Sequence, residues 1–367
     1  MSHRDSRDVI VVGAGASGLA AATALHAAGR DTLCLEARDH TGGRLLSAPT
    51  SHPERALDLG ATWFWDGEER VRALAARAGI ETFAQHLAGD TLLEETTGTR
   101  RLAGNLMDVP SRRFAAGSQS IATALAAALP AGSVRLNTPV TAIHPDGQGG
   151  LAVLTPAGTV HAEHVILAIP PALALERVDF GGALPADLVR VARATPVWMG
   201  AVAKVVAQYR AAFWREEGLA GAAFSRTGPL QEIHDLSGPD GRPAALFGFA
   251  HARRVRAGFD KAVATQLGRL FGPAAATPDV LHVQNWSTEQ FTSPSTVQHL
   301  ADYSLFGHSL YQRPALDGRL HWASTETATD HAGHIEGALA AGERAAQSVL
   351  TAPGAPNSRD KRFADWP

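Results

Sequence analysis

The chain has 367 residues, of which 45% are hydrophobic and 19% are charged, with a formal net charge of -3 and a pI near 6.6. A chain of this size buries a sizeable core and normally forms two domains. Its charge balance offers no basic field to nucleic acid or to an anionic membrane, so neither is expected as a partner. The single cysteine, Cys34, excludes a disulfide framework.

The first expected element is a strand over Val9 to Val12, a wholly apolar run typical of a strand buried on both faces of a parallel sheet. A glycine turn follows. Gly13 permits a tight turn, Gly15 lets the backbone approach a pyrophosphate, and Gly18 lets helix and strand pack closely.

The next expected element is a helix from Ala16 to about Ala28, rich in alanine and leucine and ended by Gly29. Its first amides, beginning with those of Ala16 and Ser17, point free N–H groups and a partial positive charge at the phosphates. A second strand, Thr32 to Leu35, then delivers Glu36, whose carboxylate accepts hydrogen bonds from ribose hydroxyls and repels a 2′-phosphate. The run therefore predicts a Rossmann-like site for an adenine dinucleotide and disfavours NADP.

The residues after Glu36 separate FAD from NAD. Ala37, Arg38 and Asp39 lead into Thr41-Gly42-Gly43-Arg44, a second glycine pair followed by a guanidinium that can reach the pyrophosphate. This resembles the glycine-glycine-arginine continuation of flavoproteins, which implies FAD as the cofactor.

Three further motifs extend the resemblance along the chain. They are LDLGATWFW at 57–65, HVILAIPP at 164–171 and GRLHWASTETATDHAGHIEGALAAGERAA at 318–346. In this order they are similar to the signatures of the flavin-containing amine oxidase family, which includes monoamine and polyamine oxidases. The resemblance implies an α/β fold, with a Rossmann-like FAD-binding domain of the glutathione-reductase type and a smaller α+β substrate domain.

The expected FAD-binding domain is discontinuous, over 1–82, 112–182 and 284–356. Its second piece is expected to hold a helix entered through Ser118 or Ser120 and strands at 134–147, 151–160 and 164–171, and its third to end with the helix 335–350. The substrate domain is expected at 83–111 and 183–283, followed by a polar tail at 357–367. A first insertion of about thirty residues implies a pocket that is shallow, open, or covered by the partner in a homo-oligomer.

The resemblance also assigns cofactor contacts beyond the turn. It places the adenine beside Val140 and the flavin beside the N-terminus of the last helix, at His334 and Ile335. The remaining cofactor residues that it implies are Gly60, Ala61, Thr62 and Glu326.

Lys204 is the strongest catalytic candidate. It lies in MGAVAKVVAQYRAAFW, which resembles the family strand whose lysine holds a water beside flavin N5. The alternative is a surface lysine on an edge strand, but the apolar neighbours Ala203, Val205 and Val206 make a buried ammonium costly unless it has a function.

The substrate side departs from the family pattern, because the aromatic cage of monoamine oxidases is missing. Thr296 and His334 occupy its two positions, with Trp63 and His331 beside them in the expected substrate pocket. Ser295 stands where mitochondrial enzymes have the cysteine that bonds flavin, so FAD is expected to be noncovalent.

His334 is either a proton acceptor or polar contact for substrate, or a structural hydrogen-bonding residue. His331 and His334 share a helical face if the helix starts early, but no metal site is expected.

Three functions remain open. The first is an amine oxidase that moves a hydride to flavin N5, with O2 reoxidising the flavin to give H2O2. The second is a desaturase or amino-acid oxidase of the same superfamily, and the third is a flavoprotein with structural FAD. The first strand begins within ten residues of Met1 and no apolar run could cross a bilayer, so a cytoplasmic protein is expected.

Overall fold

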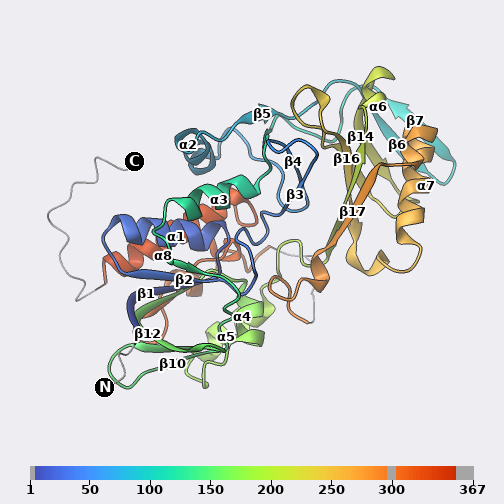
Figure 1. Ribbon diagram of the computed structural model, residues 1–367. Helices are drawn as coiled ribbons and strands as arrows, with labels where there is room; N and C mark the ends of the chain where they lie inside the picture. The colour runs from blue at the N-terminus through green and yellow to red at the C-terminus, as the bar shows by residue number, and fades with distance from the viewer. Residues whose placement is uncertain (1–4, 296–302, 353–367) are drawn as a thin grey trace.

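The computed structural model describes residues 5–295 and 303–352. Two sheets organise this part of the chain (Figure 1). None of its helices combines the length and the apolar character that a membrane crossing requires.

The first sheet has the strand order β10-β11-β12-β1-β2-β9, and β18 pairs with the last three residues of β12, on the side opposite β1. Pairing is parallel from β18 and β12 through β1 and β2 to β9, whereas β10, β11 and β12 pair antiparallel. The strands are β1 (Ser6–Val12), β2 (Thr32–Leu35), β9 (Val134–Arg135), β10 (Ala142–Pro145), β11 (Leu151–Thr155), β12 (Gly158–Leu167) and β18 (Leu320–Trp322).

Helices cover both faces of this sheet, as the apolar run in β1 predicts. Val9 and Val11 belong to one core cluster, with α1 (Ala16–Ala27), α3 (Gln119–Ala127) and α8 (Ile335–Leu350). Ile10 and Val12 point the opposite way, into a cluster with α4 (Pro171–Arg177) and α5 (Ala186–Ala194). Figure 1 shows α1, α3 and α8 on one side and α4 and α5 on the other. Successive strand residues alternate between the two cores because the side-chain period of a strand is two.

The second sheet has the order β17-β13-β16-β15-β14-β6-β7 and forms a separate lobe, with α7 (Phe259–Phe271) against it (Figure 1). Its strands are β6 (Asp90–Glu95), β7 (Gly98–Leu102), β13 (Val202–Tyr209), β14 (Leu219–Ser225), β15 (Glu232–Asp235), β16 (Ala244–His251) and β17 (Val280–Asn285). The remaining elements are the hairpin β3 (Ser47–Pro49) and β4 (Ala56–Asp58), the pair β5 (Thr82–Ala84) and β8 (Arg112–Phe114), and the helices α2 (Glu69–Arg77) and α6 (Phe213–Glu216).

Several expected elements are confirmed, and three expected strands are corrected. The helix 16–28, the strand 32–35 and the helix 335–350 appear within one residue of their expected bounds. The expected strand 134–147 is instead the two short strands β9 and β10, because Asn137 has a φ of 52° and Pro139 follows. The expected strands 151–160 and 164–171 are redivided, since β12 begins at Gly158 and ends at Leu167, before Pro170.

Candidate active site

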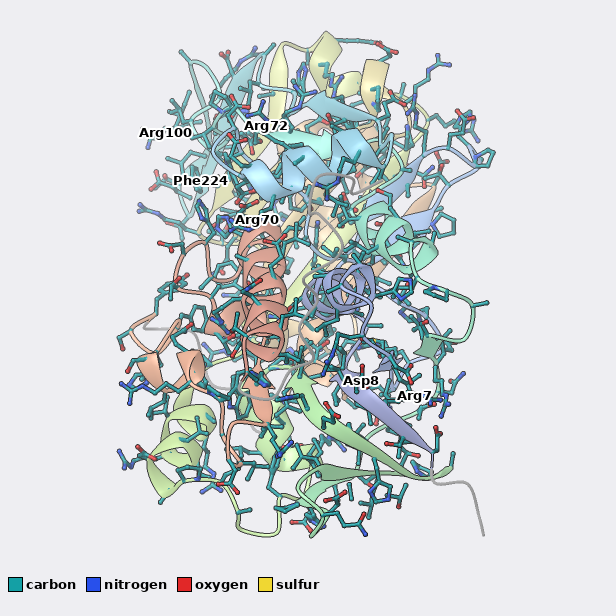
Figure 2. All side chains as sticks on the ribbon, turned by 90° about the vertical axis from the view of Figure 1, so that its left-hand side faces the viewer. Arg7, Asp8, Arg70, Arg72, Arg100 and Phe224 are labelled. Atoms are coloured by element: carbon teal, nitrogen blue, oxygen red, sulfur yellow. The ribbon has the colours of Figure 1, made fainter. Side chains whose placement is uncertain are left out.

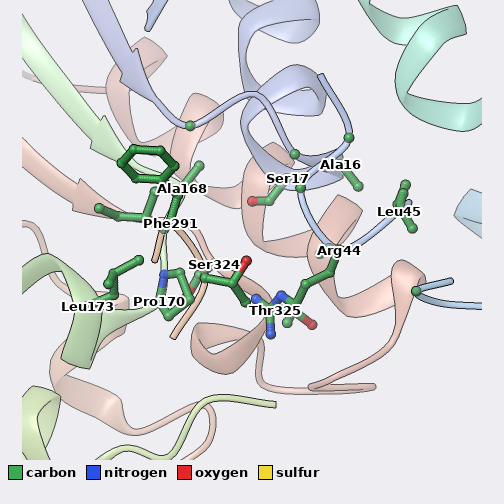
Figure 3. A pocket seen from close by; sticks show the side chains of 18 of the residues that line it. Ala16, Ser17, Arg44, Leu45, Ala168, Pro170, Leu173, Phe291, Ser324 and Thr325 are labelled. Carbon is green, nitrogen blue, oxygen red and sulfur yellow. The ribbon is translucent and has the colours of Figure 1, made fainter. Parts of the chain in front are cut away.

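A cavity of about 500 Å³ lies at the carboxyl ends of β1, β2 and β12, where ligands of such sheets bind (Figure 3). It reaches the aromatic residues beside the second sheet. The sequence-predicted residues that line it are Gly13, Gly15, Ala16, Ser17, Glu36, Ala37, Arg38, Gly43, Arg44, Gly60, Ala61, Thr62, Trp63, Val140, His334 and Ile335. Gly18, Lys204, Glu326 and His331 lie outside this lining, and Thr296 lies outside the described residues.

The glycine turn leaves room for a phosphate group above the start of α1. Gly13 has a φ of 100°, and a Cβ at Gly18 would lie 1.9 Å from the Gly13 carbonyl oxygen, so both positions require glycine. A Cβ at Gly15 would instead meet only the Gly42 oxygen, at 3.7 Å. Gly15 therefore faces open space, which fits the close approach of a pyrophosphate.

Glu36 is fixed at the end of β2 by two backbone amides. One carboxylate oxygen accepts from Ala14 N at 2.7 Å and the other from Arg38 N at 2.9 Å. Thr138 N donates to the Glu36 backbone carbonyl at 2.8 Å and so brings the segment before Val140 beside the acid. The side chain of Arg38 donates to Thr292 at 2.8 Å, which ties this end of the cavity to the segment after β17.

Arg44 and Glu326 form a two-point ion pair, with N···O distances of 2.6 and 3.0 Å. The Glu326 carboxylate also accepts from Trp198 N at 3.1 Å. Burial would raise the pKa of Glu326, but Arg44 and these hydrogen bonds hold it below its ordinary value. Glu326 therefore orients Arg44 at the cavity wall and does not line the cavity itself.

The surroundings of the Ser324 hydroxyl indicate that a polar cofactor fits this cavity. Its side chain is 1% exposed, lines the cavity, and has an Oγ with no hydrogen-bond partner among the described residues. Figure 3 shows Ser324 near Ser17, at the start of α1, and the Ser17 hydroxyl donates to the carbonyl of the adjoining Ala323. A buried hydroxyl is normally satisfied, so the geometry fits a bound group with polar atoms here. The glycine turn, Glu36 and Ser324 together fit a dinucleotide.

Lys204 lies one layer behind the cavity. It is completely buried on β13, which pairs with β16 and β17 on its two sides, so the edge-strand alternative is wrong. Its Nζ donates to the Gly60 carbonyl at 2.9 Å and contacts the Thr62 hydroxyl. Gly60 and Thr62 both line the cavity, so they connect the lysine to it.

Burial controls the protonation of Lys204. Desolvation lowers its pKa to about 7, Asp58 opposes this shift, and Arg113 adds to it. Asp58 is buried as well, and burial raises its pKa although Lys204 and Ser118 N oppose that shift. A lysine with a pKa near neutrality can hold or release a proton at working pH.

The substrate side of the cavity has aromatic walls. Trp63 lines it and donates from Nε1 to Gln85 at 3.2 Å. Trp65, Trp198 and Phe249 also line it, although their sequence positions predict no role for them. Trp65 stands inside the run LDLGATWFW, which resembles a family signature, and that position is its only signal in the sequence.

His334 lines the cavity and His331 does not. The helix α8 begins at Ile335, and His331 precedes it with a φ of 53° and an exposed side chain, so the two imidazoles do not share a helical face. Glu68 was missed, although its carboxylate lies 2.6 Å from His334 Nδ1. Ser295 is exposed and donates to Glu176 through both its backbone N and its Oγ at 2.8 Å.

Comparisons with known proteins agree with this geometry. The sequence model for flavin-containing amine oxidoreductases matches residues 92–350, and that for an NAD(P)-binding Rossmann-like domain matches residues 11–78. The putrescine oxidase of Kocuria rosea is 26% identical over 94% of this chain and 95% of the relative. Flavin-containing amine oxidase B of Homo sapiens is 25% identical over 95% of this chain and 86% of the relative.

Solved structures show the same fold. A putrescine oxidase bound to putrescine superposes with a TM-score of 0.82 at 23% identity, over 94% of this chain and 99% of the other. The sequence alignment with the Kocuria rosea enzyme extends over 465 positions, whereas this chain has 367 residues. That relative therefore carries segments that this chain lacks.

Proposed function

Because this chain belongs to the family of flavin-containing amine oxidoreductases, we propose that it oxidises a primary or secondary amine with noncovalently bound FAD. It is an FAD-dependent oxidoreductase of the amine oxidase type. One observation carries the proposal: a single cavity joins the glycine turn and Glu36 to the aromatic walls beside Lys204.

The residues that line or adjoin this cavity have different roles. The amides at the start of α1 and the Arg44 guanidinium would hold the diphosphate, and Glu36 would accept from ribose hydroxyls. When bound, the flavin accepts a hydride equivalent from the carbon beside the substrate nitrogen. Lys204 holds or moves a proton at Nζ, and the Thr62 hydroxyl lies between it and the cavity. The imine product hydrolyses in water, and O2 is the electron acceptor, giving H2O2.

The aromatic walls support an amine substrate. Trp63, Trp65 and Phe249 line the cavity, and the face of an aromatic ring attracts an ammonium group electrostatically. Relatives whose names state their activity, putrescine oxidase and flavin-containing amine oxidase B, act on amines.

Ser295 supports noncovalent binding. It offers no thiol, and both its backbone N and its Oγ are engaged by Glu176. Acid precipitation of the purified yellow protein should therefore release all flavin into the supernatant. A coloured precipitate would contradict this part of the proposal.

Anaerobic bleaching of the bound flavin tests the activity. The holoenzyme is mixed with a panel of amines, amino acids and non-amine reductants, and flavin absorbance is followed before and after air is admitted. Bleaching by amines, with H2O2 released on reoxidation, is the expected result. Bleaching only by amino acids or by non-amine compounds would assign a different bond, and no bleaching at all would point to a structural flavin.

A further inference from the structure

We infer that Glu68 holds the His334 imidazole in the tautomer with its proton on Nδ1, so that Nε2 accepts the proton of the substrate ammonium. The inference rests on the proposed amine oxidation, which requires a neutral nitrogen. Glu68 acts as a positioning residue, and His334 is the residue that meets the substrate.

The geometry fixes which imidazole nitrogen donates. Glu68 Oε1 lies 2.6 Å from His334 Nδ1, and Oε2 accepts from Trp65 N at 3.2 Å. An ionised carboxylate only accepts hydrogen bonds, so Nδ1 carries the proton and Nε2 has a free lone pair in the neutral ring. The described residues give Nε2 no hydrogen-bond partner, and His334 lines the cavity with a side chain 36% exposed.

Two packed helices hold this pair in place. Glu68 immediately precedes α2 and His334 immediately precedes α8. The buried Glu336 carboxylate of α8 accepts from Val71 N at 3.0 Å and from the Arg70 guanidinium at 3.0 Å, both on α2. Figure 2 shows Arg70 beside α8. Thr325 Oγ1 also donates to the His334 carbonyl at 3.0 Å, so the backbone of His334 is fixed independently of its ring.

Trp65 completes a site for an ammonium group. Its ring lies 5.0 Å from the imidazole, with an angle of 37° between the planes, and it lines the same cavity. The indole face attracts a cation, and the neighbouring Nε2 accepts its proton. In this step one N–H bond of the ammonium breaks, the Nε2–H bond forms, and the positive charge moves from the substrate to the imidazole.

The charges around His334 show why Glu68 is needed. The N-terminus of α8 disfavours a cation, and the His331 ring lies 6.0 Å away. The Arg44 guanidinium is paired with Glu326, and Arg70 is shared between Glu336 and Glu343. The Glu68 carboxylate, 2% exposed and 2.6 Å from Nδ1, is the negative charge in direct contact with the ring, and it would balance an imidazolium there.

Anaerobic flavin reduction by a bleaching amine, measured across pH, tests the inference. Glu68→Gln should slow flavin reduction at neutral pH by about tenfold or more. In the plot of reduction rate against pH, the fall on the acidic side should move to lower pH, because the imidazolium loses its counter-charge. His334→Phe should slow reduction by about 10²-fold and remove that fall, while keeping an aromatic wall. The matched control is Glu69→Gln, at the exposed neighbouring position, which should keep the wild-type dependence of reduction rate on pH. If the reduction rate of Glu68→Gln depends on pH as that of Glu69→Gln does, the inference is overturned. The proposed function would still stand in that case, because the wild-type flavin is bleached by the amine.

The tautomer gives a second readout that does not depend on turnover. Holoenzyme labelled with ¹⁵N-histidine is studied by long-range ¹H–¹⁵N correlation, and the His334 signals are those lost in His334→Phe. The expected pattern is a neutral ring protonated on Nδ1, the less common form for a free histidine. Protonation on Nε2 at neutral pH would overturn the inference even if no amine tested reduced the flavin.

Discussion

The Lys204 ammonium lies 4.2 Å from the centroid of the Phe247 ring, on neighbouring strands of the second sheet. Both side chains are buried. An aromatic face stabilises a cation by only about 1 to 2 kcal/mol, much less than burial costs an ammonium. The ring and the Gly60 carbonyl therefore keep Lys204 oriented toward Thr62 without returning its pKa to an ordinary value.

Replacing Lys204 by Met should slow flavin reduction or reoxidation by about 10²-fold while FAD stays bound, because the proton-carrying group behind Thr62 is lost. Stopped-flow absorbance of the two half-reactions measures each rate. Lys261→Met, at an exposed position of α7, is the control and should behave as wild type. Wild-type rates in both half-reactions of Lys204→Met would remove Lys204 from the mechanism.

The same variant should change how stability depends on pH. Lys204 has a pKa of about 7 when folded and 10.5 as its ordinary value, so between these pH values the unfolded chain binds more protons than the folded one. The free energy of unfolding of wild type, relative to Lys204→Met, should therefore rise as pH increases from about 7 toward 10. Urea unfolding of both proteins at several pH values measures the difference. A difference that stays flat or falls would mean that Lys204 titrates near its ordinary value.

Ser324→Ala should affect the apoprotein and the holoprotein in opposite directions. Removing a buried hydroxyl with no partner should stabilise the apoprotein by about 1 kcal/mol, whereas FAD affinity should fall by about 0.5 to 1.5 kcal/mol. Unfolding of apoprotein and FAD titration measure the two changes. Ser51→Ala, at an exposed position, is the control. Unchanged FAD affinity would show that the hydroxyl does not meet the cofactor.

Glu36→Ala should weaken FAD binding by about 1 to 3 kcal/mol, because a charged hydrogen-bond acceptor is lost and the amides of Ala14 and Arg38 lose their partner. Glu36→Gln should lose less, since an amide oxygen still accepts. Fluorescence titration of apoprotein with FAD gives the dissociation constants, with Glu54→Ala as an exposed control. A wild-type constant for Glu36→Ala would count against the ribose assignment.

The elements between Val9 and Glu36 were predictable because their signals are local. The glycine turn, the helix end at Gly29 and the strand before Glu36 depend on residues a few positions away, and the structure confirms these elements, with β1 beginning earlier, at Ser6. The division at Asn137 was not predictable, because a positive φ at a residue other than glycine has only a weak sequence signal.

Pairs that are distant in the chain were beyond the sequence. Arg44 and Glu326 were each predicted at the cofactor, but their mutual ion pair joins positions 282 apart. Glu68 and His334 are 266 positions apart, and only the packing of α2 on α8 brings them together. Thr62, predicted as a cofactor contact, meets Lys204 because β13 passes behind the 57–65 segment.

The first sheet draws its strands from stretches near 6–35, 134–167 and 320–322, and α8 closes the cavity from residue 335 onward. During synthesis, the glycine turn leaves the ribosome long before the segment that holds Ser324 and His334. A nascent chain therefore acquires the full lining of its nucleotide pocket only after Ala338, on α8, has emerged. Cofactor capture is thereby coupled to the synthesis of α8, and chains that terminate before it lack the far wall of the pocket.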